Sequence, residues 1–210
     1  MSKRVGILCI FLGVACLLGA LGFVCYNRWE AGKAADQTQS ILEEVQAVMA
    51  TEAPEQTESQ GESLPVPEFS EALPEQMPTI SVDGYDCIGI LSIPVLELEL
   101  PVLTDWSYQK LKKAPCLYYG SYFEKDFVIA AHNYASYFGK LPQLQPGDLV
   151  IFTDVLGVDR YYTVTLMETL PKEATQEMIT SGFDLSLYTC TPGGASRVTA
   201  RCTAGLQNRG

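Results

Sequence analysis

Two residues able to do covalent chemistry stand at the ends of β-type segments. Cys190 closes the alternating run 185–190 and is followed by a Pro-Gly-Gly turn, and His132, the only histidine, closes the apolar run 127–132. An imidazole near a thiol can promote the thiolate, which is the nucleophile, and then act as base and acid. A lone histidine is more often structural, but the matching strand-end cysteine favours catalysis. The pair predicts a cysteine nucleophile, Cys190, with His132 as its proton-transfer partner.

An arginine completes this prediction. Acyl transfer through a thiol builds negative charge on a carbonyl oxygen, which a guanidinium can stabilise. Arg197 and Arg201 both follow the Pro-Gly-Gly turn. If a six-residue connection joins the two strands, Cys190 and Arg197 face each other with Cα atoms about 5 Å apart, and Arg201 lies about 13 Å further along. We therefore expect Arg197 to serve the site.

The other cysteines do not show the spacing of a disulfide framework or a metal site. Of the seven cysteines, three lie in the apolar N-terminal stretch, where cysteine behaves as a small hydrophobe. The chain has no CxxC pair and one histidine, so we predict no metal site. Cys87, Cys116 and Cys202 are expected to be buried free thiols, and a disulfide between two of them stays open.

The N-terminal run 5–26 is apolar and uncharged, long enough for a helix to cross a bilayer. A cleaved signal peptide is the alternative, but its apolar region is normally shorter and ends in a small-x-small site. Lys3 and Arg4 before the run favour a cytoplasmic N-terminus. We expect a cytoplasmic tail (1–4), a transmembrane anchor (5–26) and an extracellular remainder.

The segment 27–83 is expected to connect the anchor to a folded domain. Residues 34–49 have helical spacing of apolar side chains, which predicts a short juxtamembrane helix or one that packs on the domain. Residues 50–79 are rich in Glu, Gln, Ser and Pro without Lys or Arg, which predicts an extended tether. This acidic segment supplies much of the net charge of −11, which argues against a nucleic-acid partner.

The remainder, 84–210, has the sequence pattern of a β domain. Strands are expected at 88–93, 98–102, 127–131, 149–153, 161–167, 185–190 and 198–202, and short helices at 107–112, 134–139 and 172–180. Many short strands without βα alternation predict a mainly β fold, closed or nearly closed into a barrel.

Four separated segments resemble the sortase family of cysteine transpeptidases. LYTCTPGGASRV (187–198) is similar to the family's Leu-x-Thr-Cys strand with its following arginine, and IAAHN (129–133) to its histidine segment. ILSIP (90–94) resembles its first strand, and LQPGDLVI (144–151) its Gly-Asp-x-Val turn. The resemblance covers nearly the whole domain.

This resemblance implies an eight-stranded sortase-type β-barrel with short helices. It also implies a transpeptidase that cleaves an LPxTG-like sorting signal through a thioacyl-enzyme. Cys190, His132 and Arg197 would be catalytic, with Thr189 supporting the substrate or oxyanion. The implied partners are secreted proteins with C-terminal sorting signals and a peptidoglycan precursor amine, and no cofactor or metal is needed.

The subclass stays open among class A, B-like and D-like enzymes. An extracellular cysteine peptidase of another family is one alternative, although such folds generally place Cys at a helix N-terminus and before His. A non-catalytic, membrane-tethered β-barrel that binds surface ligands is the other.

Overall fold

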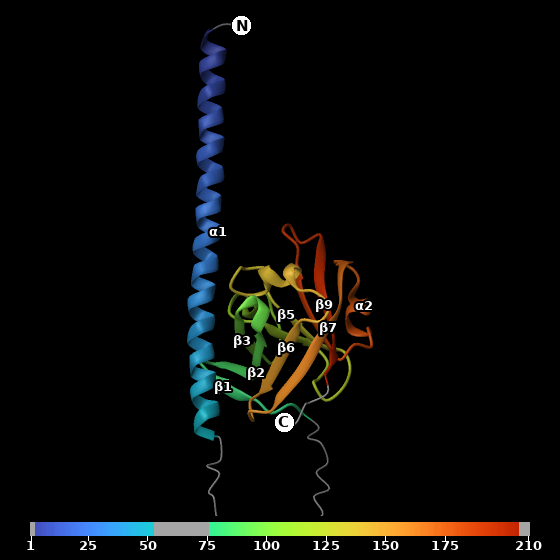
Figure 1. Ribbon diagram of the computed structural model, residues 1–210. Helices are drawn as coiled ribbons and strands as arrows, with labels where there is room; N and C mark the ends of the chain where they lie inside the picture. Colours follow the sequence, from blue (N-terminus) through green and yellow to red (C-terminus); the bar gives the residue numbers. More distant parts are fainter. Residues whose placement is uncertain (1–2, 53–75, 206–210) are drawn as a thin grey trace, which may run out of the picture.

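The computed structural model describes residues 3–52 and 76–205. In these ranges the chain forms a long helix, a β-barrel and short helical turns (Figure 1). The helices are α1 (Lys3–Glu52), α2 (Thr175–Ile179) and the 3-10 turns η1 (Pro94–Leu96), η2 (Lys110–Lys112) and η3 (Phe138–Gln143). The strands are β1 (Ile80–Val82), β2 (Tyr85–Ile93), β3 (Leu98–Leu103), β4 (Cys116–Tyr119), β5 (Phe127–Ala130), β6 (Leu149–Asp154), β7 (Asp159–Pro171), β8 (Leu185–Cys190) and β9 (Ser196–Ala204).

Strands β2 to β9 close into a mixed barrel of eight strands, with β1 paired along the start of β2. The order is β2-β3-β4-β5-β8-β9-β7-β6, and β6 returns to pair with β2. The β3–β4 and β5–β8 pairs are parallel. The eight-stranded mainly β barrel expected from the sequence is thus confirmed.

The barrel closes where β2 and β6 approach each other tightly. Gly89 has φ 154° and pairs with Asp154, and a Cβ at this position would lie 2.2 Å from the Thr153 carbonyl oxygen. Only glycine fits such a close backbone approach without displacing β6.

Alternating apolar residues fill the barrel interior, since successive side chains of a strand point to opposite faces. Leu185 and Leu187 of β8 and Ala200 and Cys202 of β9 point into this core. Aromatic rings from different strands fill its centre, with Phe127 and Phe152 at a centroid distance of 5.2 Å. The side chains on the inward face of β8 are therefore committed to the core, and those on the outward face, among them Cys190, are available for a site.

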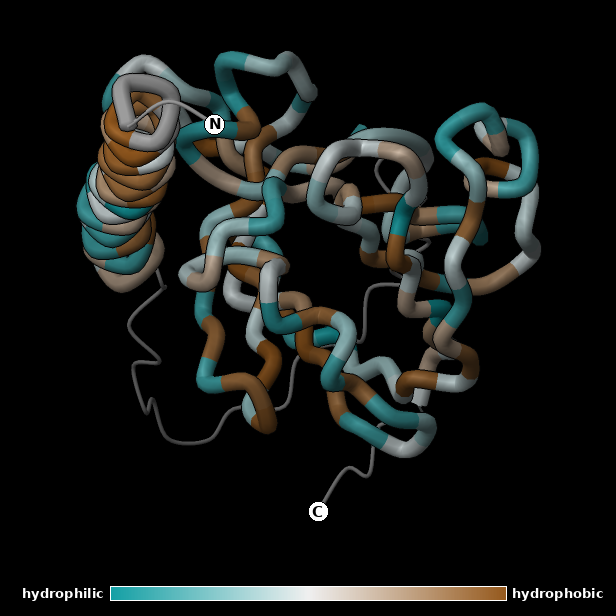
Figure 2. Tube along the Cα trace, turned by 90° about the horizontal axis from the view of Figure 1, so that it is seen from above, coloured by the Kyte–Doolittle hydropathy of each residue, from teal (hydrophilic) through white to brown (hydrophobic). Residues whose placement is uncertain are grey.

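Helix α1 is one continuous helix of 50 residues, not an anchor followed by a separate short helix. Its apolar N-terminal part extends beyond the barrel (Figure 1), and it is long and apolar enough to cross a membrane. Seen from above, the helix stands at the edge of the barrel (Figure 2). Residues 27–33 contain no proline, and Gly32 alone does not end a helix.

The C-terminal part of α1 packs on the barrel. Its buried residues recur at spacings of three and four, as one helix face requires; they are Ala34, Thr38, Ile41, Leu42 and Val45. Ile41, Leu42 and Val45 join one apolar cluster with strands β1 to β4. The Tyr137 hydroxyl lies 2.9 Å from the Ala34 carbonyl oxygen and 2.8 Å from that of Lys113, and it also bonds the Thr38 hydroxyl.

The expected strands all occur, with ends shifted by a few residues. Two strands were missed, β1 and β4. The expected helices at 107–112, 134–139 and 172–180 correspond to the shorter η2, η3 and α2. The expected tether falls mostly on residues 53–75, which lie outside the described residues.

Candidate active site

Three strand ends bring the predicted residues together. Parallel β5 and β8 pair Ala130 with Tyr188, and the next amide, of Ala131, donates to the Tyr188 carbonyl oxygen at 3.2 Å. Continuing the register by two residues beyond the Ala130–Tyr188 pair places His132 beside Cys190. On the other edge of β8, antiparallel β9 pairs Cys190 with Arg197.

His132, two residues beyond the end of β5, Cys190 at the end of β8 and Arg197 near the start of β9 all line one pocket. The pairing of Cys190 with Arg197 confirms the register that the six-residue connection predicted.

The pocket is small and walled by aromatic rings. Its volume is about 110 Å³. The Trp106 ring lies 5.5 Å from that of Tyr118, which lies 5.2 Å from that of Tyr188, edge to face. The Arg197 guanidinium carbon lies 5.3 Å from the Tyr188 ring centroid, within the range of a cation–π contact. Rings thus hold both the pocket wall and the guanidinium in place.

His132 is half-buried, and its surroundings favour the neutral imidazole. Burial lowers its pKa, Lys112 lowers it further, and Glu30 opposes this. Lys112 and Glu30 themselves form an ion pair of 2.9 Å. The Tyr134 ring stacks on the imidazole at a centroid distance of 4.9 Å. A neutral imidazole can accept a proton, as a general base must.

The two candidate arginines have different environments. Nη1 of Arg197 is buried and has no hydrogen-bond partner among residues 3–52 and 76–205. Arg201 is 1% exposed and fully engaged, with bonds to Glu168 (2.7 Å), Ser186 (2.8 Å) and the carbonyl oxygens of Glu177 and Met178. An unpaired buried donor in a pocket suits an arriving oxygen atom. Arg201 is a structural residue of the barrel wall.

Thr189 lies behind the pocket, not in it. It is 2% exposed, and its hydroxyl donates a hydrogen bond of 2.8 Å to the carbonyl oxygen of Ala131. This bond ties β8 to the residue that precedes His132. The alternating pattern of the sequence placed Thr189 on the face opposite Cys190, but only the fold reveals this contact.

The other thiols of the barrel are buried and free. Burial raises the pKa of Cys87, Cys116 and Cys202 to about 12 each. Cys190, by contrast, is exposed. Within the described ranges, no group of three or more His, Cys, Asp or Glu side chains could hold a metal ion.

Sequence reasoning missed the aromatic wall. Trp106 and Tyr108 come from the β3–η2 connection, which is far in sequence from Cys190, yet both line its pocket. Two aromatic residues close together in a connecting segment were the available signal.

Residues 91–204 match the family model of the sortase domain. Since this is more than half of the 210 residues, the chain belongs to the sortase family. No match occurs among curated proteins.

Solved structures with the same fold are sortases of several classes. Sortase A from Corynebacterium diphtheriae is 22% identical, with a TM-score of 0.54 over 60% of this chain and 64% of that one. Sortase C1 from Streptococcus agalactiae is 22% identical, with a TM-score of 0.53 over 61% and 72%. A Clostridium perfringens sortase D5 transpeptidase is 18% identical, with a TM-score of 0.52 over 60% and 82%. The chain thus spans less than two thirds of the first of these. At such identities the likeness defines the fold and no subclass.

Proposed function

We propose that this chain is a membrane-anchored cysteine transpeptidase that cuts a C-terminal, LPxTG-like sorting signal and joins the protein to a cell-wall amine. One observation carries the proposal. His132, Cys190 and Arg197 lie at or just beyond the ends of the neighbouring strands β5, β8 and β9 and line one pocket, and Nη1 of Arg197 has no hydrogen-bond partner in the part of the chain that the structure describes.

In the first half-reaction, the thiol proton of Cys190 passes to His132, and Sγ attacks the carbonyl carbon of the scissile peptide bond. Arg197 stabilises the negative charge that develops on the carbonyl oxygen. The carbon–nitrogen bond then breaks, and His132 returns the proton to the leaving amine. The product is a thioester between the substrate protein and Cys190.

In the second half-reaction, an amine of a peptidoglycan precursor attacks the thioester carbonyl. His132 takes the proton from this amine, the new amide bond forms, and the carbon–sulfur bond breaks to release the Cys190 thiolate. The proton on His132 then returns to this sulfur. Thr189 supports this chemistry at a distance, because its bond to the Ala131 carbonyl oxygen holds the strand end that carries His132.

The apolar part of α1 supports a single-pass anchor over 5–26. In this arrangement 1–4 are cytoplasmic, and 84–210 form an extracellular catalytic domain. The segment 27–83 then joins the two and includes the part of α1 that packs on the barrel.

The test is hydroxylaminolysis. The full chain in detergent is incubated with a panel of sorting-signal peptides and hydroxylamine, and the hydroxamate product is measured. We expect product from the wild type and none from Cys190→Ala. Cys25→Ala, which removes an exposed thiol of α1, is the matched control and should retain full activity.

Absence of Cys190-dependent product from every peptide of the panel would contradict the transpeptidase proposal. Equal activity in the wild type and Cys190→Ala would assign the cleavage to another group.

A further inference from the structure

Helix α1 sets the height of the barrel above any membrane it crosses. A tether after the anchor would leave the domain free to move away from the bilayer. Instead, the same uninterrupted helix that carries the apolar run packs on the barrel from Ala34 to Val45. The buried bonds of Thr38 and Tyr137 reinforce this contact.

The boundary of the apolar part is marked by residues that favour the membrane–water interface. Tyr26 and Trp29 have ring centroids 6.2 Å apart, and Lys33 lies 3.7 Å from the Trp29 ring centroid. Aromatic rings and basic side chains with apolar stems favour the headgroup layer. Glu30 follows one helical turn beyond Tyr26, a rise of about 6 Å.

The candidate active site lies at this same end of the barrel. Glu30 pairs with Lys112, which adjoins Leu111 of the pocket wall. Tyr134, which stacks on His132, lines a second cavity together with Glu30, Lys33 and Lys112. The pocket is thus adjacent to the boundary of the apolar segment.

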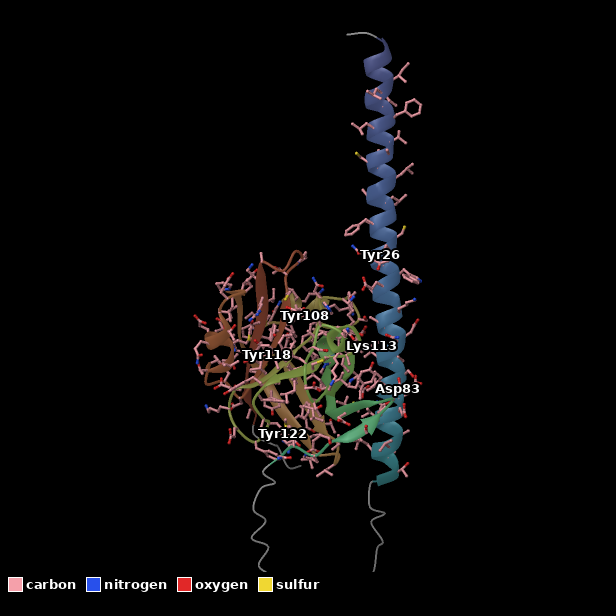
Figure 3. The ribbon with its side chains drawn as sticks, turned by 180° about the vertical axis from the view of Figure 1, so that it is seen from behind. Tyr26, Asp83, Tyr108, Lys113, Tyr118 and Tyr122 are labelled. Carbon is pink, nitrogen blue, oxygen red and sulfur yellow. The ribbon has the colours of Figure 1, made fainter. Side chains whose placement is uncertain are left out.

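The figures agree with these contacts. Figure 1 shows the connection between β8 and β9, in red, at the end of the domain from which the apolar part of α1 projects. Figure 3 shows Tyr26 on α1 level with the loops at that end, and Tyr108 below them. The β8–β9 connection joins Cys190 to the strand of Arg197.

The surface at this end suits a lipid headgroup layer. Trp106 is 41% exposed and Tyr108 is 75% exposed, and their rings are in edge-to-face contact at 5.7 Å. The β8–β9 connection, 191–195, carries no charge. The nearby Lys110 and Lys112 each pair with a carboxylate.

We propose that the barrel end with the Cys190 pocket rests on phospholipid headgroups, held there by α1, so that the pocket takes substrates attached to the same bilayer. This inference rests on the proposed anchor and activity.

The test uses tryptophan fluorescence, since the chain has two tryptophans. Trp29→Phe leaves only Trp106, in the pocket wall, and Trp106→Phe leaves only Trp29, at the helix boundary. Each full-length variant is reconstituted in phosphatidylcholine–phosphatidylglycerol vesicles that carry a nitroxide on the lipid headgroup. We expect the loss of Trp106 fluorescence to be comparable to the loss of Trp29 fluorescence.

A lifted variant tests the role of the helix. In this lifted variant, seven helix-forming residues are inserted between Trp29 and Glu30, which lengthens α1 by about 10 Å and moves the barrel away from the membrane. Seven residues make nearly two whole turns, so the helix face that packs on the barrel keeps its direction relative to the anchor. Quenching of Trp106 should be lost while that of Trp29 persists. The same seven residues inserted after position 60 are the matched control and should change neither. The lifted variant should keep its activity on soluble peptide but lose turnover of a membrane-spanning substrate in the same vesicle.

The outcomes separate the two proposals. Quenched Trp29 with unquenched Trp106 would overturn the resting position while leaving the anchor intact. If the chain does not float with the vesicles, the anchor fails and this inference with it. Cys190-dependent hydroxamate formation from soluble peptide reports the transpeptidase chemistry independently of both results.

Discussion

Cys190 and Arg197 lie directly opposite each other on β8 and β9, whereas Arg201 pairs with Ser186 further down the same two strands. The register therefore gives two arginines of one strand separate roles. Arg197 lines the pocket, and its Nη1 has no hydrogen-bond partner among the described residues. Arg201 instead connects the barrel wall to Glu168 and to the end of α2.

We expect substitution of the two arginines to separate activity from stability. Arg197→Gln should lower turnover by about 10²- to 10³-fold, because it removes a charged donor from the developing oxyanion, with little change in unfolding. Arg201→Gln should lower the free energy of unfolding by about 3 kcal/mol, because it leaves its buried partners unsatisfied. Denaturant unfolding and hydroxylaminolysis measure the two effects. Equal destabilisation by both variants would contradict the separate roles.

The pKa of His132 should respond in opposite directions to its two charged neighbours. Lys112→Gln removes a positive charge, which should raise this pKa, and Glu30→Gln removes a negative charge, which should lower it. The double variant should lie near the wild type. With one histidine in the chain, a single imidazole signal followed by NMR during a pH titration reports the value. Shifts of the same sign in both single variants would contradict this account.

The lowered pKa also predicts a dependence of stability on pH. Folding favours the neutral imidazole, so this contribution is complete above the unfolded pKa of about 6.5. This contribution to the free energy of unfolding is lost as the pH falls from the pKa of the unfolded state through the lower pKa of the folded state. His132→Gln should reduce this part of the pH dependence, measured by denaturant unfolding at a series of pH values.

The cysteines of the barrel should differ sharply in alkylation. Iodoacetamide should modify exposed Cys190 in the folded protein, whereas Cys87, Cys116 and Cys202 are buried and their raised pKa values leave almost no thiolate at neutral pH. Peptide mapping by mass spectrometry identifies the modified sites. In denaturant all four thiols should react. Modification of Cys116 as fast as Cys190 in the folded state would contradict this prediction.

Thr189 should act as a positioning residue. Thr189→Val removes the donor to the Ala131 carbonyl oxygen and loosens the strand end that carries His132. We expect kcat to fall about ten- to hundredfold with KM nearly unchanged. Thr189→Ser keeps the hydroxyl and should restore most of the rate. A raised KM with unchanged kcat would instead assign Thr189 to substrate binding.

The Tyr137 hydroxyl should contribute to the docking of α1. Tyr137→Phe leaves the ring in place but removes the bonds to Ala34 and Thr38, which should cost about 1–3 kcal/mol. Hydrogen exchange of the α1 amides from Ala34 to Val45 should accelerate. Tyr134→Phe, in the same segment but without a hydrogen bond to α1, is the matched control.

Much of the barrel and of the site was predictable from local signals. The strands are bounded by turn residues, and the alternation of 185–190 correctly assigned Cys190 and Thr189 to opposite faces. The pairing of Cys190 with Arg197 followed from the length of the connection. Strand periodicity and loop length are properties of a short segment, which the sequence displays directly.

The missed features depend on partners distant in sequence. Strands β1 and β4 are only three and four residues long, and they exist because they pair with β2 and β5. The packing of residues 34–49 on the domain was one of two alternatives left open by the sequence, because the face that covers this helix is built by β1 to β4. A helical pattern shows which face of a helix is apolar, but not what covers it.

The parallel pairing of β5 with β8 has a consequence for the order in which the parts of the domain come together. These strands are separated in the chain by β6, β7 and α2, so the pairing closes a long loop and forms late. His132 reaches Cys190 only through this pairing. An emerging chain thus brings Cys190 and His132 into one pocket only when the barrel is almost complete.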